Sequence, residues 1–326
     1  MSRIAVLGAG AWGTSIASVL AARLDVTLWA RDPVQAQGIA RSRRNERYLT
    51  GIELPASLIV SADFEAAISK AELLLAATPV AGLRELFKRL QSRTSLVWLC
   101  KGFEEGSGLL PHQIAAEILG DAASVGALSG PSFAEEVARG LPCALTLAAK
   151  DAGFARAAAA LLHGGRMRVY YSADLIGVEI GGAVKNVMAI AAGISDGLRL
   201  GQNARAALIT RGLAEITRLG VALGGLPETL MGLAGAGDLI LTATGDLSRN
   251  RRVGLELAAG RKLDEILNGL GHVAEGVRSA KEVFSLAKKK NVDMPVTEAV
   301  HAVLEGQLKP AAAVERLLSR DAKSER

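Results

Sequence analysis

The chain has 326 residues, a hydrophobic content of 50%, an aromatic content of 4% and a formal net charge of +5. This composition excludes a disordered chain, and the length is sufficient for two domains with separate cores. Cys100 and Cys143 lack the spacing of metal ligands, so we predict neither a disulfide framework nor a metal site. Charged residues interrupt every apolar run before the length of about 18 residues that a membrane helix needs. Because a signal-peptide pattern is also missing, we expect a cytoplasmic protein without an integral membrane segment.

Positive charge is scattered along the chain. Short basic clusters occur at 41–47, 249–252 and 288–290, and no row of aromatic residues accompanies them. Nucleic-acid binding usually combines clustered basic residues with a recognisable motif or with aromatic side chains that stack on bases. We therefore predict no nucleic-acid partner and interpret the charge as suited to small anionic molecules.

The first half of the chain alternates short apolar runs with amphipathic stretches. The apolar runs predict strands at Ile4–Leu7, Val26–Trp29, Leu58–Val60, Leu73–Ala77, Leu96–Cys100, Val125–Leu128 and Ala144–Ala148. Helical patterns occur at Trp12–Ala22, Pro33–Arg44, Ala81–Arg89, Pro111–Ile118 and Pro131–Arg139. Strands that alternate with helices predict a mostly parallel sheet covered on both faces. We predict a Rossmann-like, doubly wound α/β domain over residues 1–173.

The strand signal stops near residue 174. The rest of the chain shows helical patterns rich in Ala, Leu and Gly, and Gly-rich turns at 224–225, 235–237 and 268–271 are expected to break them. We predict an all-α domain over residues 174–326, with a frayed, charged tail at 319–326.

A glycine-rich motif follows the first predicted strand and opens the first predicted helix. Its sequence, Gly8-Ala9-Gly10-Ala11-Trp12-Gly13, matches the G-x-G-x-x-G pattern of dinucleotide-binding turns. In such a turn Gly8 permits a tight bend, Gly10 lets the backbone approach the pyrophosphate, and Gly13 lets the helix pack closely on the sheet. The free N–H groups at the helix start then bind the pyrophosphate. We predict a dinucleotide site here.

The kind of dinucleotide depends on the residues that follow the second predicted strand. An acidic side chain at this place selects the ribose of NAD, whereas an arginine accommodates the 2′-phosphate of NADP. Arg31 and Asp32 both occur there, and they favour opposite cofactors. Because Arg31 comes first after the strand, we predict that NADP(H) is favoured, with NAD(H) as the alternative.

Two lysines have contexts that favour a role in binding or catalysis. Lys101 directly follows a predicted strand, and the carboxyl ends of parallel strands line the ligand crevice of such sheets. Lys185 lies four residues after Gly181 on the same helix face. Its apolar neighbours are expected to desolvate it, which lowers the pKa of an amine and suits it to proton transfer. The alternatives are a solvated surface lysine for Lys101 and a lysine that extends to solvent at a domain edge for Lys185.

The paired glycines Gly181 and Gly182 need an explanation of their own. Glycine in a helix interior costs about 1 kcal/mol relative to alanine. We predict that a cofactor or a strand approaches the helix closely at this pair.

A polar group lies further along the predicted helical domain. Asp238 follows Gly237, and the run Ser248–Arg252 opens another helical pattern. A hydroxyl, a guanidinium and an amide at a helix start form a good phosphate clamp. The alternative for Ser248 is a plain helix N-cap beside solvated arginines.

Eight segments then occur in one order between Gly8 and Ala280. They are GAGAWGT from Gly8, WARD from Trp29, CKGFE from Cys100, LSGPSFAEEVA from Leu128, GGAVKNVMAIAAG from Gly181, NARAALITRGLAEI from Asn203, GAGDLILTATGDLSRNRRVG from Gly235 and VAEGVRSA from Val273. Together they resemble the bacterial NAD(P)-dependent glycerol-3-phosphate dehydrogenase family, and the resemblance covers most of the chain. Ala11 and Ala243 depart from residues common in that family, a Ser and a Cys.

The resemblance implies a 6-phosphogluconate-dehydrogenase-like fold and reversible conversion of dihydroxyacetone phosphate to sn-glycerol 3-phosphate, which supplies glycerophospholipid synthesis. It places Lys185 as the proton acceptor, and the catalytic set that we predict is Lys185, Asp238 and Asn186. The implied substrate-binding residues are Lys101, Gly130, Ser132, Lys185, Asp238, Ser248, Arg249 and Asn250. The predicted cofactor-binding residues are Gly8, Gly10, Trp12, Gly13, Arg31, Lys101, Ala134, Arg249, Val273 and Glu275. Exposed apolar helices favour a homodimer.

Other functions remain open at this point. Related dehydrogenases, of β-hydroxyacids or of the ketopantoate-reductase kind, share the same architecture, which by itself does not fix the substrate. The cluster of Ser248, Arg249 and Asn250 favours a phosphorylated substrate over these. A non-catalytic NADPH sensor or scaffold is disfavoured by the presence of both Lys185 and Asp238.

Overall fold

The computed structural model describes residues 2–90, 95–121, 123–270 and 274–321. The chain forms two compact units. Unit 1 comprises Met1–Glu104 and Leu109–Val178, and unit 2 comprises Glu105–Gly108 and Glu179–Arg326. The predicted domain boundary after residue 173 lies close to the end of unit 1 and stays a prediction.

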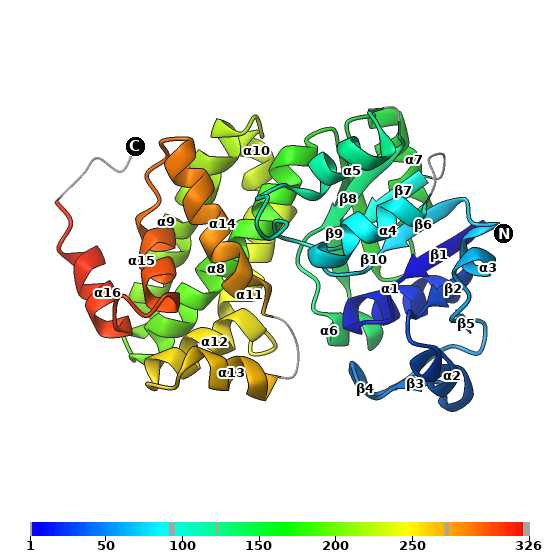
Figure 1. The fold of residues 1–326 in the computed structure, drawn as a ribbon, viewed down its shortest axis with the longest axis horizontal. Coiled ribbons are helices and arrows are strands. Elements are labelled where there is room, and N and C mark those ends of the chain that lie inside the picture. Colours follow the sequence, from blue (N-terminus) through cyan, green and yellow to red (C-terminus); the bar gives the residue numbers. More distant parts are fainter. Residues whose placement is uncertain (1, 91–94, 122, 271–273, 322–326) are drawn as a thin grey trace. The chain divides into compact units, whose positions relative to one another are not determined.

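Unit 1 is built on an eight-stranded sheet (Figure 1). The strands are β1 (Arg3–Leu7), β2 (Asp25–Trp29), β5 (Ile59–Ser61), β6 (Leu73–Ala76), β7 (Ser95–Trp98), β8 (Val125–Ser129), β9 (Cys143–Ala148) and β10 (Met167–Ser172). Their order is β10-β9-β8-β7-β6-β1-β2-β5, with parallel neighbours except for the antiparallel pair β8–β9. Since β1 lies between β2 and β6, the winding direction reverses at β1, which is where such sheets bind ligands.

Helices cover both faces of this sheet. The helices of unit 1 are α1 (Ala11–Ala21), α2 (Pro33–Ser42), α3 (Phe64–Ile68), α4 (Leu83–Arg89) after the short 3-10 turn η1 (Val80–Gly82), α5 (Pro111–Leu119), α6 (Ala134–Ala138) and α7 (Ala152–Leu162). Apolar side chains of α1, α2 and α7 share one core cluster with the strands. On the other face, Phe87 of α4 packs on Trp98 of β7, and Phe64 of α3 packs edge-on against Trp29 of β2. This arrangement confirms the doubly wound α/β prediction.

Several elements of unit 1 differ from the prediction. All predicted strands are present, but the sequence analysis missed β10, α3, α7 and the small antiparallel pair β3 (Arg44–Asn45) and β4 (Leu49–Glu53). In β10, buried Met167 and Val169 alternate with exposed Arg168 and Tyr170, a pattern too short to be distinctive. In α7, alanine at most positions leaves little contrast between a buried and a solvent face.

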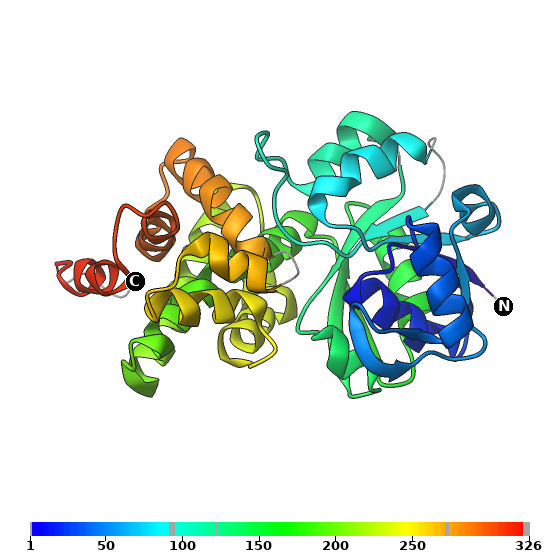
Figure 2. The ribbon, with the colours of Figure 1, turned by 60° about the horizontal axis from the view of Figure 1, so that its bottom comes forward.

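The described residues of unit 2 form helices and connecting turns, coloured green to red in Figures 1 and 2. They are α8 (Leu175–Gly197, which begins in unit 1), α9 (Gly201–Ala222), α10 (Pro227–Leu230), the π-helical turn η2 (Leu233–Gly237), α11 (Asp238–Thr244), α12 (Arg249–Ala258), α13 (Leu263–Leu270), α14 (Glu275–Lys289), α15 (Pro295–Leu304) and α16 (Pro310–Leu318). Helix α8 is long and apolar enough to cross a membrane by length and hydropathy, contrary to the sequence analysis. However, 94% of the window that passes this test is buried, as in the core helix of a globular domain.

One of the predicted helix breaks is wrong. The segment Gly235–Gly237 belongs to η2, which continues directly into α11. The break predicted at 268–271 is present, because α13 ends at Leu270 and α14 begins at Glu275, although Asn268 and Gly269 still belong to α13 and Gly271 lies outside the described residues. The break at Gly224–Gly225 is present, between α9 and α10. The part of the predicted tail from residue 322 onward is also outside the described residues.

Candidate functional site

The glycine-rich turn has the geometry that a dinucleotide requires. Gly8 has a φ of +126°, in the region that favours glycine, and a Cβ there would lie 2.9 Å from the carbonyl oxygen of Ala77. A Cβ at Gly13 would overlap the carbonyl oxygen of Gly8, so helix α1 packs closely on the turn. A Cβ at Gly10 would have no neighbouring atom within 4 Å, and no side chain caps α1 at this residue. The turn therefore leaves room for a pyrophosphate at the helix start.

Two amide side chains that the sequence analysis missed hold this turn. Gln35 Nε2 and Asn45 Nδ2 donate to the carbonyl oxygen of Ala9, at 2.9 and 3.0 Å. Asn45 Nδ2 also lies 2.7 Å from Thr14 Oγ1 in α1. Asn45 is buried, so these bonds are protected from water and fix the conformation of the turn. The motif itself carries no signal for these residues, which come from α2 and β3.

The two residues that bear on cofactor choice are used differently. Asp32 caps helix α2, because its carboxylate accepts a hydrogen bond of 2.9 Å from the backbone N–H of Val34. Arg31 is exposed, directly before it. The acidic side chain is thus engaged in helix capping, and both side chains are exposed.

Three predicted substrate-binding residues of unit 1 lie together beyond the adjacent strands β7 and β8. Lys101 Nζ donates to the carbonyl oxygen of Gly130 at 3.2 Å, and Ser132 Oγ donates to the same oxygen at 3.0 Å. Gly130 has a φ of +140°, and a Cβ there would lie 3.0 Å from the backbone of Ala144. The structure therefore brings an amine and a hydroxyl to one carbonyl at the ligand-binding edge of the sheet.

The two remaining predicted cofactor residues of unit 1 lie near helix α1. Ser15 Oγ of α1 donates to the carbonyl oxygen of Ala134 at 2.6 Å, which joins the start of α6 to α1. Trp12 is half-buried and packs against the core cluster.

In unit 2, a buried ion pair joins helices α8 and α11. Lys185 is 6% exposed and Asp238 is 1% exposed, and Lys185 Nζ contacts Asp238 Oδ1. Lys185 Nζ also donates to Thr242 Oγ1 at 2.8 Å, while that hydroxyl donates to the carbonyl oxygen of Asp238 at 2.6 Å. Because the hydroxyl proton is used in this way, the oxygen of Thr242 is oriented to accept from the amine. The sequence analysis missed Thr242, although it lies one helical turn after Asp238 on the same face.

Gly181, one helical turn before Lys185, allows another backbone segment to pack closely against α8. A Cβ at Gly181 would lie 2.6 Å from the carbonyl oxygen of Ala234 and 3.0 Å from Gly235 Cα. The partner of this close approach is the backbone of η2, so the expectation of a cofactor or strand at this glycine is wrong. Since Lys185 follows Gly181 by one turn and Asp238 directly follows η2, the close packing sets the distance at which the ion pair forms.

A second buried network begins at the next residue of α8. Asn186 Oδ1 accepts from Asn250 Nδ2 at 3.0 Å, and Asn250 Oδ1 accepts from the N–H of Gly276 at 3.0 Å. Asn186 Nδ2 is buried and has no hydrogen-bond partner within the described part of the chain. Because an unsatisfied buried amide is costly, this donor is available for a bound molecule.

The residues of the predicted phosphate clamp make different contacts. Ser248 caps helix α12 by accepting from the N–H of Arg251 at 3.2 Å, as the alternative interpretation held. Arg251 forms a 2.8 Å ion pair with Asp196 on α8, and Asp196 also accepts from Arg205. Arg249 is exposed at the first position of α12. Arg249 is therefore the residue of this set whose position suits an anionic ligand.

One predicted cofactor residue lies at the start of α14. Glu275 is its first residue and is half-buried. Val273 lies outside the described residues.

The chemistry that these groups support follows from their types. Unit 1 offers a turn that fits a dinucleotide pyrophosphate, with the Lys101 amine near a strand end. Unit 2 offers a buried amine held by a carboxylate and a hydroxyl, a proton-transfer group of fixed orientation. These are the parts that a nicotinamide-dependent oxidoreductase needs.

Comparisons with known proteins point the same way. A family profile described as the NAD-dependent glycerol-3-phosphate dehydrogenase N-terminus matches residues 3–155, and one described as the C-terminus of the same family matches residues 174–315. The chain is 58% identical over 326 residues to glycerol-3-phosphate dehydrogenase [NAD(P)+] of Dechloromonas aromatica, covering 99% of both chains. It is 59% identical over 327 residues to the enzyme of the same name from Aromatoleum aromaticum, covering 99% of this chain and 100% of that one.

Structural similarity extends over both units. The crystal structure of glycerol-3-phosphate dehydrogenase from Coxiella burnetii matches with a TM-score of 0.92 and 42% sequence identity, covering 98% of this chain and 99% of that one. The profiles, the sequence identity and the shared structure lead to one conclusion. The chain belongs to the NAD-dependent glycerol-3-phosphate dehydrogenase family.

Proposed function

We propose that this chain is an NAD(P)-dependent dehydrogenase that interconverts dihydroxyacetone phosphate and sn-glycerol 3-phosphate. The observation that supports the catalytic roles is the buried Lys185–Asp238 pair, which Thr242 helps to hold. The next residue, Asn186, has a buried Nδ2 without a hydrogen-bond partner among the described residues. The names of the relatives supply the substrate and the cofactor type, and the geometry supplies residues able to perform the reaction.

The proton in this reaction moves through Lys185. When bound, the nicotinamide donates or accepts the hydride at the carbon that carries the ketone. As the carbonyl oxygen becomes an alkoxide, the amine of Lys185 donates a proton to it, and in the reverse direction neutral Lys185 removes the proton of the hydroxyl group. Asp238 and Thr242 hold the amine in one orientation. Asn186 Nδ2 donates to a substrate oxygen, which satisfies the buried amide.

Phosphate recognition is assigned to the start of α12. Arg249 binds the substrate phosphate through its planar, bidentate guanidinium. The free N–H groups and the dipole at the start of α12 favour the same negative charge. Ser248 and Asn250 flank Arg249, and their hydrogen bonds within the protein keep this helix start in place.

We also propose that NADP(H) is favoured over NAD(H). The carboxylate that would accept from the ribose 2′-hydroxyl of NAD belongs to Asp32, and it already accepts from the N–H of Val34 as a helix cap. Arg31 is exposed beside it and suits a 2′-phosphate. The cofactor would lie against Gly8, Gly10 and Gly13, with Lys101, Ala134 and Glu275 as further contacts.

The decisive experiment is a rate assay with two substrates and two cofactors. We expect oxidation of NADPH and NADH with dihydroxyacetone phosphate, a higher kcat/KM with NADPH, and little activity with unphosphorylated dihydroxyacetone. Equal rates with both substrates would contradict the phosphate site, and activity only with 2-ketoacids would contradict the proposed reaction.

We further propose that the enzyme acts in the cytoplasm as a homodimer and supplies glycerol 3-phosphate for glycerophospholipid synthesis. Exposed apolar side chains of unit 2, including Leu226, Met231 and Ile240, support an interface with a second copy. Sedimentation equilibrium tests the dimer, because a monomer at micromolar concentration would contradict it.

A further inference from the structure

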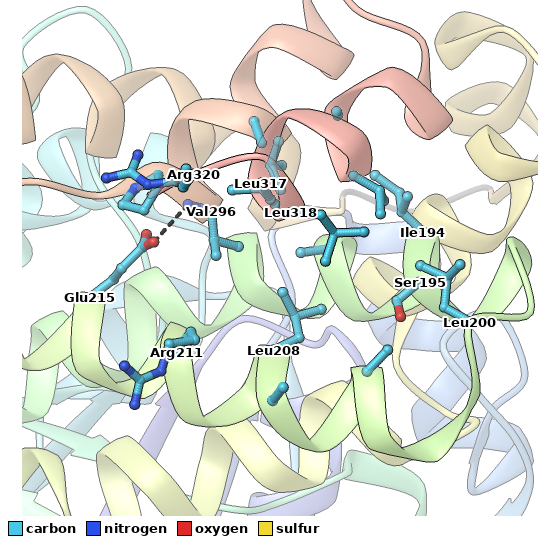
Figure 3. Close-up of a pocket in the computed structure, with 18 of the residues that line it drawn as sticks. Ile194, Ser195, Leu200, Leu208, Arg211, Glu215, Val296, Leu317, Leu318 and Arg320 are labelled. Atoms are coloured by element: carbon cyan, nitrogen blue, oxygen red, sulfur yellow. Dashed lines mark hydrogen bonds between the residues drawn. The ribbon is translucent and has the colours of Figure 1, made fainter. Parts of the chain in front are cut away.

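An apolar groove in unit 2 lies apart from the residues assigned to catalysis. Its volume is about 840 Å³, and it lies between α8, α9, α15 and α16 (Figure 3). Ligand pockets in proteins usually measure about 300–1,000 Å³, so this groove is large enough for a small molecule. Neither Lys185, Asp238, Thr242 nor Asn186 lines it.

The polar and apolar residues of the groove are segregated along its length. Along α9 the lining residues run from Leu200, the N-cap residue of the helix, to Arg218, which corresponds to about 27 Å of helix. Figure 3 shows Arg211, Glu215 and Arg320 toward one end and Ile194, Ser195 and Leu200 toward the other. Leu208 and Leu318 lie between these ends. The groove is therefore amphipathic along its axis, and it has charged groups at only one end.

Of the three carboxylates that line the groove, those of Glu215 and Asp293 are engaged within the protein, and the third belongs to Asp321 beside Arg320. Glu215 accepts from the N–H groups of Val296 and Thr297, at 2.6 and 3.1 Å, at the start of α15. Asp293 forms a 3.0 Å ion pair with Arg320. These contacts hold α15 and the chain segment after α16 in place.

The arginines on α9 are the groups at this end that suit an anionic ligand. Arg218 donates through Nε and Nη2 to the carbonyl oxygen of Asp293, which is a neutral acceptor. Arg211 lies two turns earlier, at a spacing of seven residues and so on the same side of α9, and both arginines are exposed. Two guanidinium groups on one helix face can bind a carboxylate or a phosphate together.

We propose that this groove binds a long-chain acyl compound with an anionic head group. The head lies near Arg211 and Arg218, and the acyl chain extends along α9 past Ala207 and Leu208 toward Leu200. Each methylene that enters the groove contributes about 0.8 kcal/mol by leaving water. This site goes beyond the proposed dehydrogenase reaction and does not depend on it.

The test uses a fluorescent hexadecanoate analogue below its micelle concentration, with the full-length chain and fluorescence anisotropy as the readout. We expect saturable binding that unlabelled hexadecanoate displaces, whereas hexanoate and hexadecyltrimethylammonium displace it poorly. Equal displacement by the cationic compound would overturn the anionic head group, and binding that does not saturate would overturn the site.

Variants on α9 locate the site. Ala207 lines the groove and Ala206 does not, although both are exposed. Ala207→Phe should weaken binding at least about tenfold by filling the groove, which corresponds to about 1.4 kcal/mol, and Ala206→Phe should not. The double variant Arg211→Gln/Arg218→Gln should weaken hexadecanoate binding, whereas Arg156→Gln on α7 should leave it unchanged.

A second copy of the chain is the competing occupant of the groove. If hexadecanoate does not bind, and Ala207→Phe but not Ala206→Phe shifts a dimer to a monomer in sedimentation equilibrium, the groove is a subunit interface and the proposal is wrong. Unchanged binding by Ala207→Phe, confirmed as folded by circular dichroism, would also overturn it.

Discussion

The amine of Lys185 and the hydroxyl of Thr242 lie 2.8 Å apart, and the hydroxyl proton is donated to the carbonyl of Asp238. Thr242 therefore acts as a positioning residue that presents only an acceptor to the lysine. Thr242→Val removes this acceptor at nearly constant volume and should lower kcat at least about tenfold, with little change in KM, because a hydrogen bond from a charged amine is worth about 1.5–3 kcal/mol. Thr242→Ser should restore most of the activity. An equal loss of kcat in both variants would show that the hydroxyl of Thr242 does not position the amine of Lys185.

Replacement of Lys185 itself should have a larger effect. Lys185→Ala should lower kcat by about 10²–10⁴-fold, the usual contribution of a general acid or base. The variant also leaves Asp238 buried without its ion pair, which is destabilising. Circular dichroism and urea unfolding of the full-length variant separate lost chemistry from lost folding. Near-normal turnover in a folded Lys185→Ala variant would remove this residue from the mechanism.

Arg249 should affect substrate binding more than turnover. Arg249→Ala should raise KM for dihydroxyacetone phosphate about tenfold or more, because a charged hydrogen bond to phosphate is lost. Arg252 is also exposed on α12, one turn further on, and forms a long contact of 3.8 Å with Glu256. Arg252→Ala is therefore the matched control and should leave KM unchanged. If both variants behave alike, the phosphate does not bind at Arg249.

Cofactor choice should depend on Arg31. Arg31→Ala should raise KM for NADPH by about 10–100-fold, as expected for one charged contact, and should change KM for NADH little. Asp32→Ala should instead lower stability by about 1 kcal/mol through loss of the α2 cap. Steady-state rates with both cofactors, together with urea unfolding of each variant, separate the two roles. A parallel rise in both KM values for Arg31→Ala would contradict recognition of the 2′-phosphate.

Glu215 should make stability depend on pH. Burial raises its pKa from 4.5 to about 7, partly offset by the hydrogen bonds from Val296 and Thr297 and by the charge of Arg218. The folded state thus binds this proton more tightly than the unfolded state. The contribution of this proton to the free energy of unfolding is therefore full below pH 4.5 and is lost as the pH rises through 7. The loss is about 3 kcal/mol, since one pKa unit corresponds to about 1.4 kcal/mol.

The variant Glu215→Gln stays neutral and should remove this part of the pH dependence. Urea unfolding at pH 5 and pH 8 measures it, and Glu305→Gln at an exposed position is the control. The wild-type chain and the control should lose more stability over this interval than Glu215→Gln. Identical pH profiles for all three proteins would show that burial of Glu215 does not shift its proton binding.

Features that depend on local sequence patterns could be predicted from the sequence. The glycine-rich turn was predictable because Gly8 and Gly13 fulfil steric requirements at a fixed spacing after a strand. Gly181 was recognised as unusual, but its partner, the backbone of η2, is distant in sequence and was not predictable. The same holds for Asn45, whose bonds to Ala9 and Thr14 arise only when β3 packs near α1.

Side-chain roles that depend on partners were predicted less well. Ser248 had two interpretations, a phosphate contact and a helix N-cap; the structure shows the N-cap bond from the N–H of Arg251, and the phosphate contact stays a prediction. Thr242 carries no charge and belongs to a common residue type, so only its position one turn after Asp238 marks it. Hydrogen bonds between helices are tertiary contacts, and one sequence contains no direct signal for them.

The glycine-mediated packing around α8 has a consequence for the mobility of the helix that carries Lys185. Backbone atoms of η2, α12 and α14 approach α8 at Gly181, at Gly193 and at Gly276 opposite Asn186. A helix enclosed in this way cannot move outward without separating these partners. Its amide hydrogens should therefore exchange with solvent only when unit 2 unfolds as a whole. Hydrogen exchange of the α8 amides would therefore report the rate at which unit 2 unfolds.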